Sequence, residues 1–189
     1  MIIVGLTGLN CSGKDTVADY MVEHESFTHY SLSDEIRKAM KRDGIETSRE
    51  NLISYGTNLR STHGNGVLAK MVMENFQENK KYCVTSIRHP DEVEVFRKSG
   101  KSFLLVNVQA PREVRFERMK KRARTGDPDT LEKFIELENK ESQTSGSGQR
   151  LVQTVALADI TFENNFQTLD ELYAAIKKLI SGSFINNYE

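Results

Sequence analysis

The sequence predicts an α/β fold in which about five parallel strands alternate with helices. Short apolar runs rich in β-branched residues recur along the chain, and longer stretches of helical period separate them. Strands that alternate with helices are typical of parallel βαβ units. The length of 189 residues fits one domain, because domains usually run to roughly 100–200 residues. We therefore expect a single domain over residues 1–181, followed by a polar tail over residues 182–189.

The expected strands lie at residues 2–6, 27–32, 82–87, 103–108 and 159–162. The first of them, Ile2 to Leu6, is apolar and ends at Gly8, as expected for a strand that is buried on both faces of a parallel sheet. The strand pattern is weakest at residues 27–32. These segments predict that the sheet begins at the N-terminal end of this sequence.

The helix with the clearest sequence pattern lies near the C-terminal end. Its apolar positions fall on one face: Leu169, Leu172, Tyr173, Ile176, Leu179 and Ile180. Thr168 and Glu171 have the spacing of a capping box and therefore predict the start of this helix. Other helix starts are indicated by Thr47 with Glu50, Pro90 before Asp91 and Glu92, and Pro111 before Glu113.

Two inserts interrupt the alternation of strands and helices. One is a helical region over about residues 47–78, and the other is a charged region over about residues 120–150. The second contains a Ser/Gly-rich, hinge-like piece at residues 144–148. We interpret the inserts as movable covers, the first an acceptor-binding insert and the second a lid.

Composition and charge restrict the class of partner. The chain has 26 basic and 27 acidic side chains, so its overall charge predicts neither a nucleic-acid-binding nor a membrane-binding surface. Cys11 and Cys83 lie in different kinds of segment, which makes a disulfide framework a poor interpretation and fits the cytoplasm. The apolar segment from Met1 to Leu6 is too short to span a membrane, and no signal peptide is evident.

A phosphate-binding loop, or Walker A motif, follows the first strand and leads directly into a helix. Its glycines let successive N–H groups point at phosphate oxygens, while Lys14 supplies a positive charge to the β- and γ-phosphates. The alternative is a glycine turn that binds no ligand. Such a turn would not explain why a strand, two spaced glycines, a lysine and a hydroxyl occur together in this order. The residues expected to bind ATP are Gly8, Asn10, Cys11, Ser12, Gly13, Lys14, Asp15 and Thr16.

The loop departs from the commonest pattern, because Asp15 follows Lys14 and the hydroxyl comes one place later at Thr16. We expect Thr16 to help place Mg²⁺, and Asp15 to face Mg²⁺ or water. Cys11 is interpreted as a tolerated small residue and not as a nucleophile, because phosphoryl transfer needs no thiolate.

Arginines at strand ends and in the first insert are the candidates for holding an acceptor phosphate, since guanidinium groups bind phosphate bidentately. Arg37, which follows Asp34 past the second strand, and Arg88, at the tip of the third, should face the crevice where ligands of open α/β sheets bind. Arg60 is a weaker candidate that surface solvation explains nearly as well. A solvated helix arginine paired with Asp34 or Glu35 is the alternative for Arg37, and capping of a carbonyl is the alternative for Arg88.

The second insert begins with a dense run of basic residues over residues 112–124. Helical spacing puts Arg115, Arg118 and Arg122 on one face, so at least one of them is expected to reach the γ-phosphate when the cover closes. A solvated or ion-paired role remains the alternative for each one.

With these residues in place, the chain resembles P-loop nucleotide kinases: adenylate-kinase-related and dephospho-CoA-kinase-like proteins of archaea, and the kinase-like domain attached to some deoxycytidylate deaminases. The resemblance is carried by residues 8–16, 85–94, 108–118 and 158–164. The Gly-Lys-Asp-Thr ending of the loop also resembles that of phage deoxynucleoside monophosphate kinases. The resemblance of the whole chain implies a doubly wound P-loop NTPase fold, ATP with Mg²⁺, and an adenine pocket flanked by Asp159 and Asn164.

Many such relatives have an acidic residue where this chain has Thr85 and Ser86, which weakens a claim of a carboxylate there that holds Mg²⁺ or acts as a general base. The leading hypothesis is an ATP-dependent phosphotransferase for a nucleoside or deoxynucleoside monophosphate. Its expected catalytic residues are Lys14, Arg88, Arg118 and Arg122, and its expected acceptor-binding residues are Asp34, Arg37, Arg60 and Arg88.

Two alternatives remain open. A dephospho-coenzyme A kinase would transfer the phosphoryl group to a sugar hydroxyl and would need a base, for which Asp34 is the only candidate. A non-catalytic nucleotide-sensing module would bind ATP without turnover. The sequence leaves open whether the protein is a monomer or a homodimer.

Overall fold

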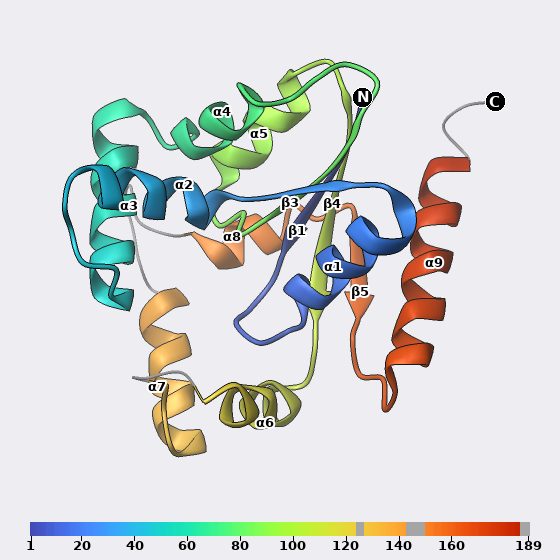
Figure 1. Ribbon diagram of the computed structural model, residues 1–189. Helices are drawn as coiled ribbons and strands as arrows, with labels where there is room; N and C mark the ends of the chain where they lie inside the picture. The colour runs from blue at the N-terminus through green and yellow to red at the C-terminus, as the bar shows by residue number, and fades with distance from the viewer. Residues whose placement is uncertain (124–126, 143–149, 186–189) are drawn as a thin grey trace.

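The computed structural model describes residues 1–123, 127–142 and 150–185, and its centre is a five-stranded sheet (Figure 1). All neighbouring strands are parallel, and their order is β2-β3-β1-β4-β5. The strands are β1 (Ile2–Thr7), β2 (Thr28–Ser31), β3 (Lys81–Thr85), β4 (Ser102–Gln109) and β5 (Ile160–Glu163). The predicted α/β fold with about five parallel strands is therefore confirmed.

Nine helices lie in the described part of the chain and connect or flank these strands. They are α1 (Lys14–Glu25), α2 (Leu32–Arg42), α3 (Arg49–His63), α4 (Val67–Met73), α5 (Pro90–Lys98), α6 (Arg112–Arg122), α7 (Leu131–Ser142), α8 (Leu151–Val155) and α9 (Leu169–Ile185). The chain thus alternates between strand and helix, as expected for parallel βαβ units.

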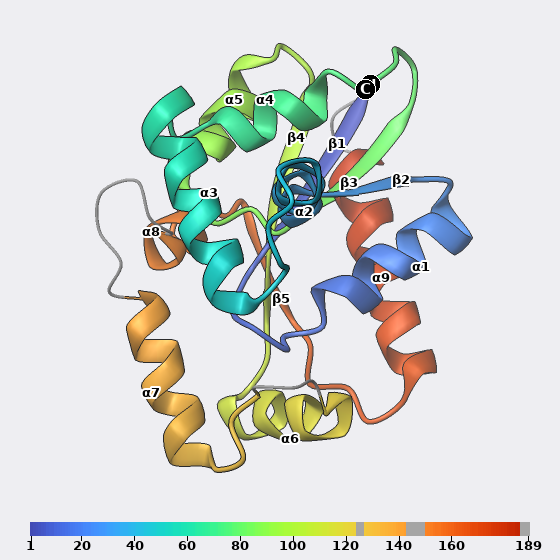
Figure 2. The same ribbon diagram turned by 60° about the vertical axis from the view of Figure 1, so that its left-hand side comes forward.

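The sheet is covered on both faces, which is the doubly wound arrangement. On one face, side chains of β1 and β4 pack against Met21 of α1 and Ile176 of α9, which are both fully buried. On the other face, β1, β3 and β4 pack against Met40 of α2, Val72 of α4 and Phe96 of α5. Figure 2 shows α2, α4 and α5 together on the side away from α9. Strands buried on both faces explain the near-continuous apolar runs of the sequence.

Gly5 lies in the middle of the central strand, where the packing leaves no room for a side chain. A Cβ atom there would lie 2.7 Å from Cδ1 of Ile87 and 2.9 Å from the ring of Phe103. Phe103 in turn stacks on Phe96, with ring centroids 5.2 Å apart. The centre of β1 is therefore held close to the segment that leaves β3.

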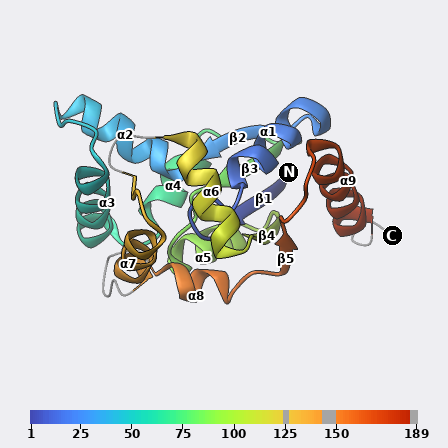
Figure 3. The same cartoon turned by 90° about the horizontal axis from the view of Figure 1, so that it is seen from below.

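The carboxyl ends of the strands meet at the lower edge of the sheet in Figure 1, and α6 lies beneath that edge. The view from below shows α6 in front of the sheet, with α7 beside it (Figure 3). The segment that we interpreted as an acceptor-binding insert forms α3 and α4 between β2 and β3. The hinge-like piece at residues 144–148 lies outside the described residues.

Two predicted helix ends differ from the structure. The hydroxyl of Ser48, and not that of Thr47, caps α3 by accepting the main-chain N–H of Asn51 at 3.1 Å. Helix α9 continues to Ile185, past residue 182 where we expected the tail to begin. The capping box of Thr168 with Glu171 is present as predicted. Within the described residues, no helix is both long and apolar enough to cross a bilayer.

Candidate functional site

A cavity of about 1010 Å³ opens at the carboxyl ends of β1, β2 and β3. Its walls come from the loop between β1 and α1, from the first turn of α2, from α3, from α6 and from the segment after β5. Ligands of open α/β sheets bind at this edge. The volume is at the upper end of the range for small-molecule pockets, roughly 300–1,000 Å³.

The side chains that line the cavity carry an excess of positive charge. The basic ones are Lys14, Arg37, Arg49, Arg60, Arg88, Arg118 and Arg122, and the carboxylates are Asp15, Asp34 and Asp127. Because the whole chain has a formal charge of −1, this excess is local. The cavity is therefore complementary to a polyanion.

The phosphate-binding loop contains glycines in backbone conformations that residues with a side chain rarely adopt. Gly8 has a φ of 129°, and a Cβ there would lie 2.2 Å from the carbonyl oxygen of Val108. Gly13 has a φ of 97° and lies against Asn164. Cys11 also has a left-handed φ, of 60°, which is uncommon outside glycine. Backbone strain of this kind gathers at ligand sites, and here it lies in the loop that faces the cavity.

Lys14, the first residue of α1, is folded back onto its own loop. Its Nζ donates to the carbonyl oxygens of Gly8, at 2.9 Å, and Leu9, at 2.7 Å. Burial, with Arg88 nearby as a second cause, lowers the pKa of Lys14 to about 7. The Lys14 ammonium therefore occupies the loop itself in this structure.

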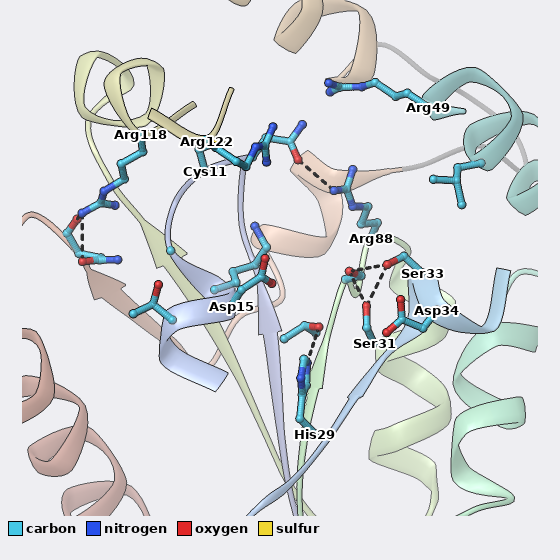
Figure 4. Close-up of a pocket in the computed structure, with 18 of the residues that line it drawn as sticks. Cys11, Asp15, His29, Ser31, Ser33, Asp34, Arg49, Arg88, Arg118 and Arg122 are labelled. Atoms are coloured by element: carbon cyan, nitrogen blue, oxygen red, sulfur yellow. Dashed lines mark hydrogen bonds between the residues drawn. The ribbon is translucent and has the colours of Figure 1, made fainter. Parts of the chain in front are cut away.

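Two side chains hold the loop from outside through the carbonyl oxygen of Ser12. Nδ2 of Asn164 donates to this oxygen at 2.8 Å, and Nη1 of Arg118 donates to it at 3.2 Å. Arg118 also donates to the main-chain oxygen of Asn164 at 3.1 Å. Burial lowers the pKa of Arg118. Both sequence candidates therefore contact the loop directly; Figure 4 shows Arg118 beside it.

Arg88 is held at both its main chain and its side chain. Its N–H donates to Oε2 of Glu92 at 2.8 Å, and its carbonyl oxygen accepts the N–H of Arg150 at 2.9 Å. Its Nη2 donates to Oδ1 of Asn10 in the phosphate-binding loop at 3.0 Å (Figure 4). The strand-tip arginine thus lines the cavity and contacts the phosphate-binding loop.

Arg60 is not a solvated surface residue, so that alternative interpretation is wrong. It is 4% exposed, and its Nη2 and Nε donate to Oε1 of Glu92 at 2.8 and 3.1 Å. A buried arginine needs a partner, because desolvation penalises an isolated charge heavily. Glu92 supplies that partner, while Arg60 also lines the cavity.

Hydroxyl groups at the tips of β2 and β3 form a cluster that the sequence analysis did not assign. Oγ of Ser31 lies 2.9 Å from Oγ of Ser33 and 3.0 Å from Oγ of Ser86. Nε2 of His29 lies 2.8 Å from Oγ1 of Thr85 (Figure 4). The signal was present in the sequence, because Ser31, Thr85 and Ser86 lie at or directly after the ends of β2 and β3.

Arg37 and Asp34 are paired with each other. Nη1 of Arg37 donates to Oδ1 of Asp34 and to Oγ of Ser33, both at 2.8 Å. The paired role that we weighed against phosphate binding is therefore the one present, although both residues line the cavity. Arg49, which begins α3, lines the same region and was missed, because nothing in the sequence places the start of α3 near the strand tips.

The basic face of α6 is divided between two roles. Arg115 is 3% exposed, pairs with Glu138 of α7 and lies over the ring of Phe134, so it does not line the cavity. Arg118 and Arg122 do line it. Nη2 of Arg122 donates to both carboxylate oxygens of Asp127 at 2.9 Å.

Magnesium would have few protein ligands at this site. The described residues contain no group of three or more His, Cys, Asp or Glu side chains that could hold a metal ion. Thr16 and Asp15 line the cavity beside the loop. Mg²⁺ usually keeps several waters and binds through one or two carboxylates and substrate phosphates, so this donor set fits an ion that arrives with a nucleotide.

Asp159 is not part of the site, and its expected place beside an adenine pocket is wrong. It precedes β5 and therefore lies at the amino end of that strand, opposite the cavity. It pairs with Arg97 at 2.8 Å and accepts the N–H of Leu105 at 2.7 Å. Asn164, at the other end of β5, does line the cavity.

The chain is similar to solved structures of small-molecule kinases over nearly its whole length. Shikimate kinase from Bacteroides thetaiotaomicron aligns with a TM-score of 0.61 and 15% identity, covering 96% of this chain and 98% of that one. Shikimate kinase from Aquifex aeolicus aligns with a TM-score of 0.58 and 20% identity, covering 97% and 99%. At these identities the likeness shows the fold, which is that of the P-loop kinases.

Sequence comparison identifies the family. A UPF0200 protein of Hyperthermus butylicus is 32% identical over 182 residues, which is 95% of this chain and 94% of the relative. A UPF0200 protein of Aeropyrum pernix is 31% identical over 169 residues, or 86% and 89% of the two chains. The family model described as an AAA domain matches residues 4–145. The chain therefore belongs to the UPF0200 proteins, within the AAA domain family and with the fold of the P-loop kinases.

Proposed function

We propose that this protein is an ATP-dependent phosphotransferase that acts on a nucleoside or deoxynucleoside monophosphate. One observation carries the proposal: a single cavity joins a phosphate-binding loop to a region that is lined by arginines and hydroxyls. That region contains no carboxylate that is free of a basic partner, within the part of the chain that the structure describes.

The loop is the donor side of the proposed reaction. Its main-chain amides and Lys14 would bind the triphosphate of ATP, because a helix N-terminus after a glycine-rich loop attracts anions. Lys14 would exchange the carbonyl oxygens of Gly8 and Leu9 for phosphate oxygens. When bound, Mg²⁺ neutralises charge on the β- and γ-phosphates, and Thr16 with Asp15 would orient its water shell.

The chemistry of the other side favours a phosphate as the acceptor. An alcohol needs a general base, and the one acidic candidate among the described residues that line this side, Asp34, is paired with Arg37. An acceptor phosphate needs none, because its second pKa of about 6 leaves it ionised at neutral pH. Arg37, Arg49 and Arg88 would hold it by bidentate hydrogen bonds.

The same region has an apolar part that suits a nucleoside. Its aliphatic side chains come from α2, α3 and α4: Ile36, Leu52, Ile53 and Leu68. Apolar walls with a few polar groups are the usual lining of small-molecule sites. A base would pack on these residues while the arginines hold its phosphate.

In the proposed reaction the protein positions the two substrates and neutralises charge, since phosphoryl transfer needs little covalent help. Arg88 is well placed for this role, because it is anchored to Asn10 of the loop and also faces the acceptor side. Arg118 and Arg122 line the donor side of the cavity from α6. Cationic donors aimed at transferring phosphates stabilise the transition state electrostatically.

The experiment is a turnover assay with Mg-ATP and a panel of ribo- and deoxyribonucleoside monophosphates. Dephospho-coenzyme A and shikimate serve as hydroxyl acceptors in the same assay, and a Lys14→Met variant serves as the inactive control. We expect transfer to at least one monophosphate and none to the hydroxyl acceptors. Transfer to a hydroxyl acceptor alone would contradict the proposal. Tight ATP binding with no transfer to any acceptor would instead support the nucleotide-sensing module.

A further inference from the structure

We infer that Asn164 is a positioning residue for the phosphate-binding loop: it orients the Ser12–Gly13 peptide so that the N–H of Gly13 faces the donor phosphates. The inference rests on the proposed binding of a nucleoside triphosphate in this loop. In this role Asn164 would affect the binding of the phosphates whatever base the ligand carries. It would not be part of an adenine pocket.

The carbonyl oxygen of Ser12 accepts two hydrogen bonds from outside the loop. A carbonyl oxygen has two lone pairs, and here it accepts from Nδ2 of Asn164 at 2.8 Å and from Nη1 of Arg118 at 3.2 Å. Both donors belong to segments far away in the sequence. The carbonyl is thus fixed in a direction that leads out of the loop.

The direction of the Ser12 carbonyl also fixes the direction of the Gly13 N–H, because the two belong to one planar peptide group. None of the described peptide bonds is cis, and in a trans peptide the C=O and the following N–H point in opposite directions. A Ser12 carbonyl that points out toward Asn164 therefore requires a Gly13 N–H that points inward. The inside of the loop is where Lys14 lies and where an anion would bind.

Asn164 is itself held in place. It is 2% exposed, and its main-chain N–H donates to the carbonyl oxygen of Gln109 at 2.7 Å, which fixes it to the end of β4. Its Oδ1 accepts from Nη2 of Arg118 at 3.3 Å. This acceptor role leaves Nδ2 as the group that faces the Ser12 carbonyl, so the amide has only one favourable orientation.

Gly13 completes the arrangement. A Cβ at this position would lie 2.1 Å from Nδ2 of Asn164, so only glycine permits the amide to approach the loop so closely. The glycine that opens helix α1 is thus matched to Asn164 as well as to its φ of 97°.

The test is a comparison of ligands that share phosphates but differ in the base. Isothermal calorimetry on the full chain with magnesium would measure the affinity for ATP, GTP and inorganic tripolyphosphate, in the wild type and in Asn164→Ala. We expect the affinity for all three ligands to fall by a similar factor of about tenfold. This is the effect of losing one hydrogen bond to a charged group, here the bond from the Gly13 N–H to a phosphate. Asn75→Ala is the matched control, because the Asn75 amide also donates to a main-chain carbonyl oxygen, that of Met71, but does not line the cavity.

Two results would overturn the inference. A loss confined to ATP, with tripolyphosphate unaffected, would make Asn164 a base contact. An unchanged affinity for all three ligands would show that Asn164 has no role in positioning the loop for phosphate binding. If the wild type itself bound none of them, the proposed function would fail together with the inference, whereas binding without turnover would leave the inference intact.

A second measurement is independent of whether Asn164→Ala folds. In wild-type protein labelled with ¹⁵N-glycine, tripolyphosphate should move the Gly13 amide proton resonance downfield, because that N–H gains a charged acceptor. The resonance of Gly100, which lies in the turn before β4, serves as the control and should not move. A Gly13 amide that does not respond to a saturating ligand would refute the inward direction of its N–H.

Discussion

Glu92 and Arg60 form an ion pair that is almost completely buried and that joins α5 to α3. The side chains are 0% and 3% exposed. The same carboxylate accepts the main-chain N–H groups of Arg88 and His89, at 2.8 and 3.0 Å. One side chain thus connects the insert, the start of α5 and the arginine that faces the phosphate-binding loop.

Removing the charge of Glu92 should destabilise the fold strongly. Glu92→Gln leaves the Arg60 guanidinium buried without a counter-charge, and breaking a buried pair costs about 3–5 kcal/mol. We expect a loss of that order in the free energy of unfolding, measured by urea denaturation. Glu94→Gln on the same helix is the control, because Glu94 pairs with the exposed Lys98. Equal effects of the two substitutions would contradict the importance that we give to burial.

Replacing Asp34 distinguishes a phosphate acceptor from a hydroxyl acceptor. Asp34→Asn should change kcat for a nucleoside monophosphate by less than about tenfold, whereas loss of a general base costs about 10²–10⁴-fold. Steady-state kinetics with saturating Mg-ATP measures this. Arg37→Met, which removes the partner, should raise KM for the acceptor and leave KM for ATP unchanged. A fall of a hundredfold or more in Asp34→Asn would identify Asp34 as a base.

Nucleotide affinity should weaken as the pH rises above 7. In the protein without nucleotide, Lys14 has a pKa of about 7 because burial disfavours its charge. A bound triphosphate would raise that pKa by favouring the ammonium. Below pH 7 the lysine is already protonated, so affinity is at its maximum. Above pH 7 the protein must take up a proton to bind, and we expect Kd to rise by about tenfold between pH 7 and pH 8.5.

Calorimetry in buffers of different ionisation enthalpy measures this proton uptake directly. Lys14→Met should bind more weakly and show no uptake in the same pH range. Uptake that persists in Lys14→Met would assign the effect to another group.

Cys11 should react slowly with alkylating agents at neutral pH, although it lines the cavity. Burial raises the pKa of its thiol, which keeps the thiolate fraction small. Mass spectrometry after iodoacetamide treatment would follow the reaction, with the fully buried Cys83 as an unreactive internal reference. A nucleotide should slow the reaction further. Rapid alkylation that a nucleotide does not affect would show that Cys11 lies outside the nucleotide site.

The sheet and the loop could be predicted because their signals are local. A strand that is buried on both faces has a contiguous apolar run, and the phosphate-binding loop is a contiguous motif between such a strand and a helix. The exact end of a helix is less well determined by sequence. This explains the cap at Ser48 in place of Thr47, which is a shift of one residue.

The contacts that organise the cavity could not be predicted in the same way. Asn164 and Ser12 are 152 positions apart, and Arg60 and Glu92 are 32 apart, so no local pattern links the partners. Burial of Arg60 follows from how α3 packs on α2 and α4, which sequence periodicity does not specify. The hydroxyl cluster around Ser31 could have been predicted, because the carboxyl ends of neighbouring parallel strands meet at one edge.

The concentration of basic side chains in the cavity has a consequence for how ligands arrive. Since the chain as a whole has a formal charge of −1, the surface outside the cavity must be net acidic. An approaching anion is repelled elsewhere and attracted at one opening, so the field of the molecule guides it. Association should therefore become slower as ionic strength increases. The relevant ionic strengths are those above about 0.1 M, where the Debye length falls below about 10 Å.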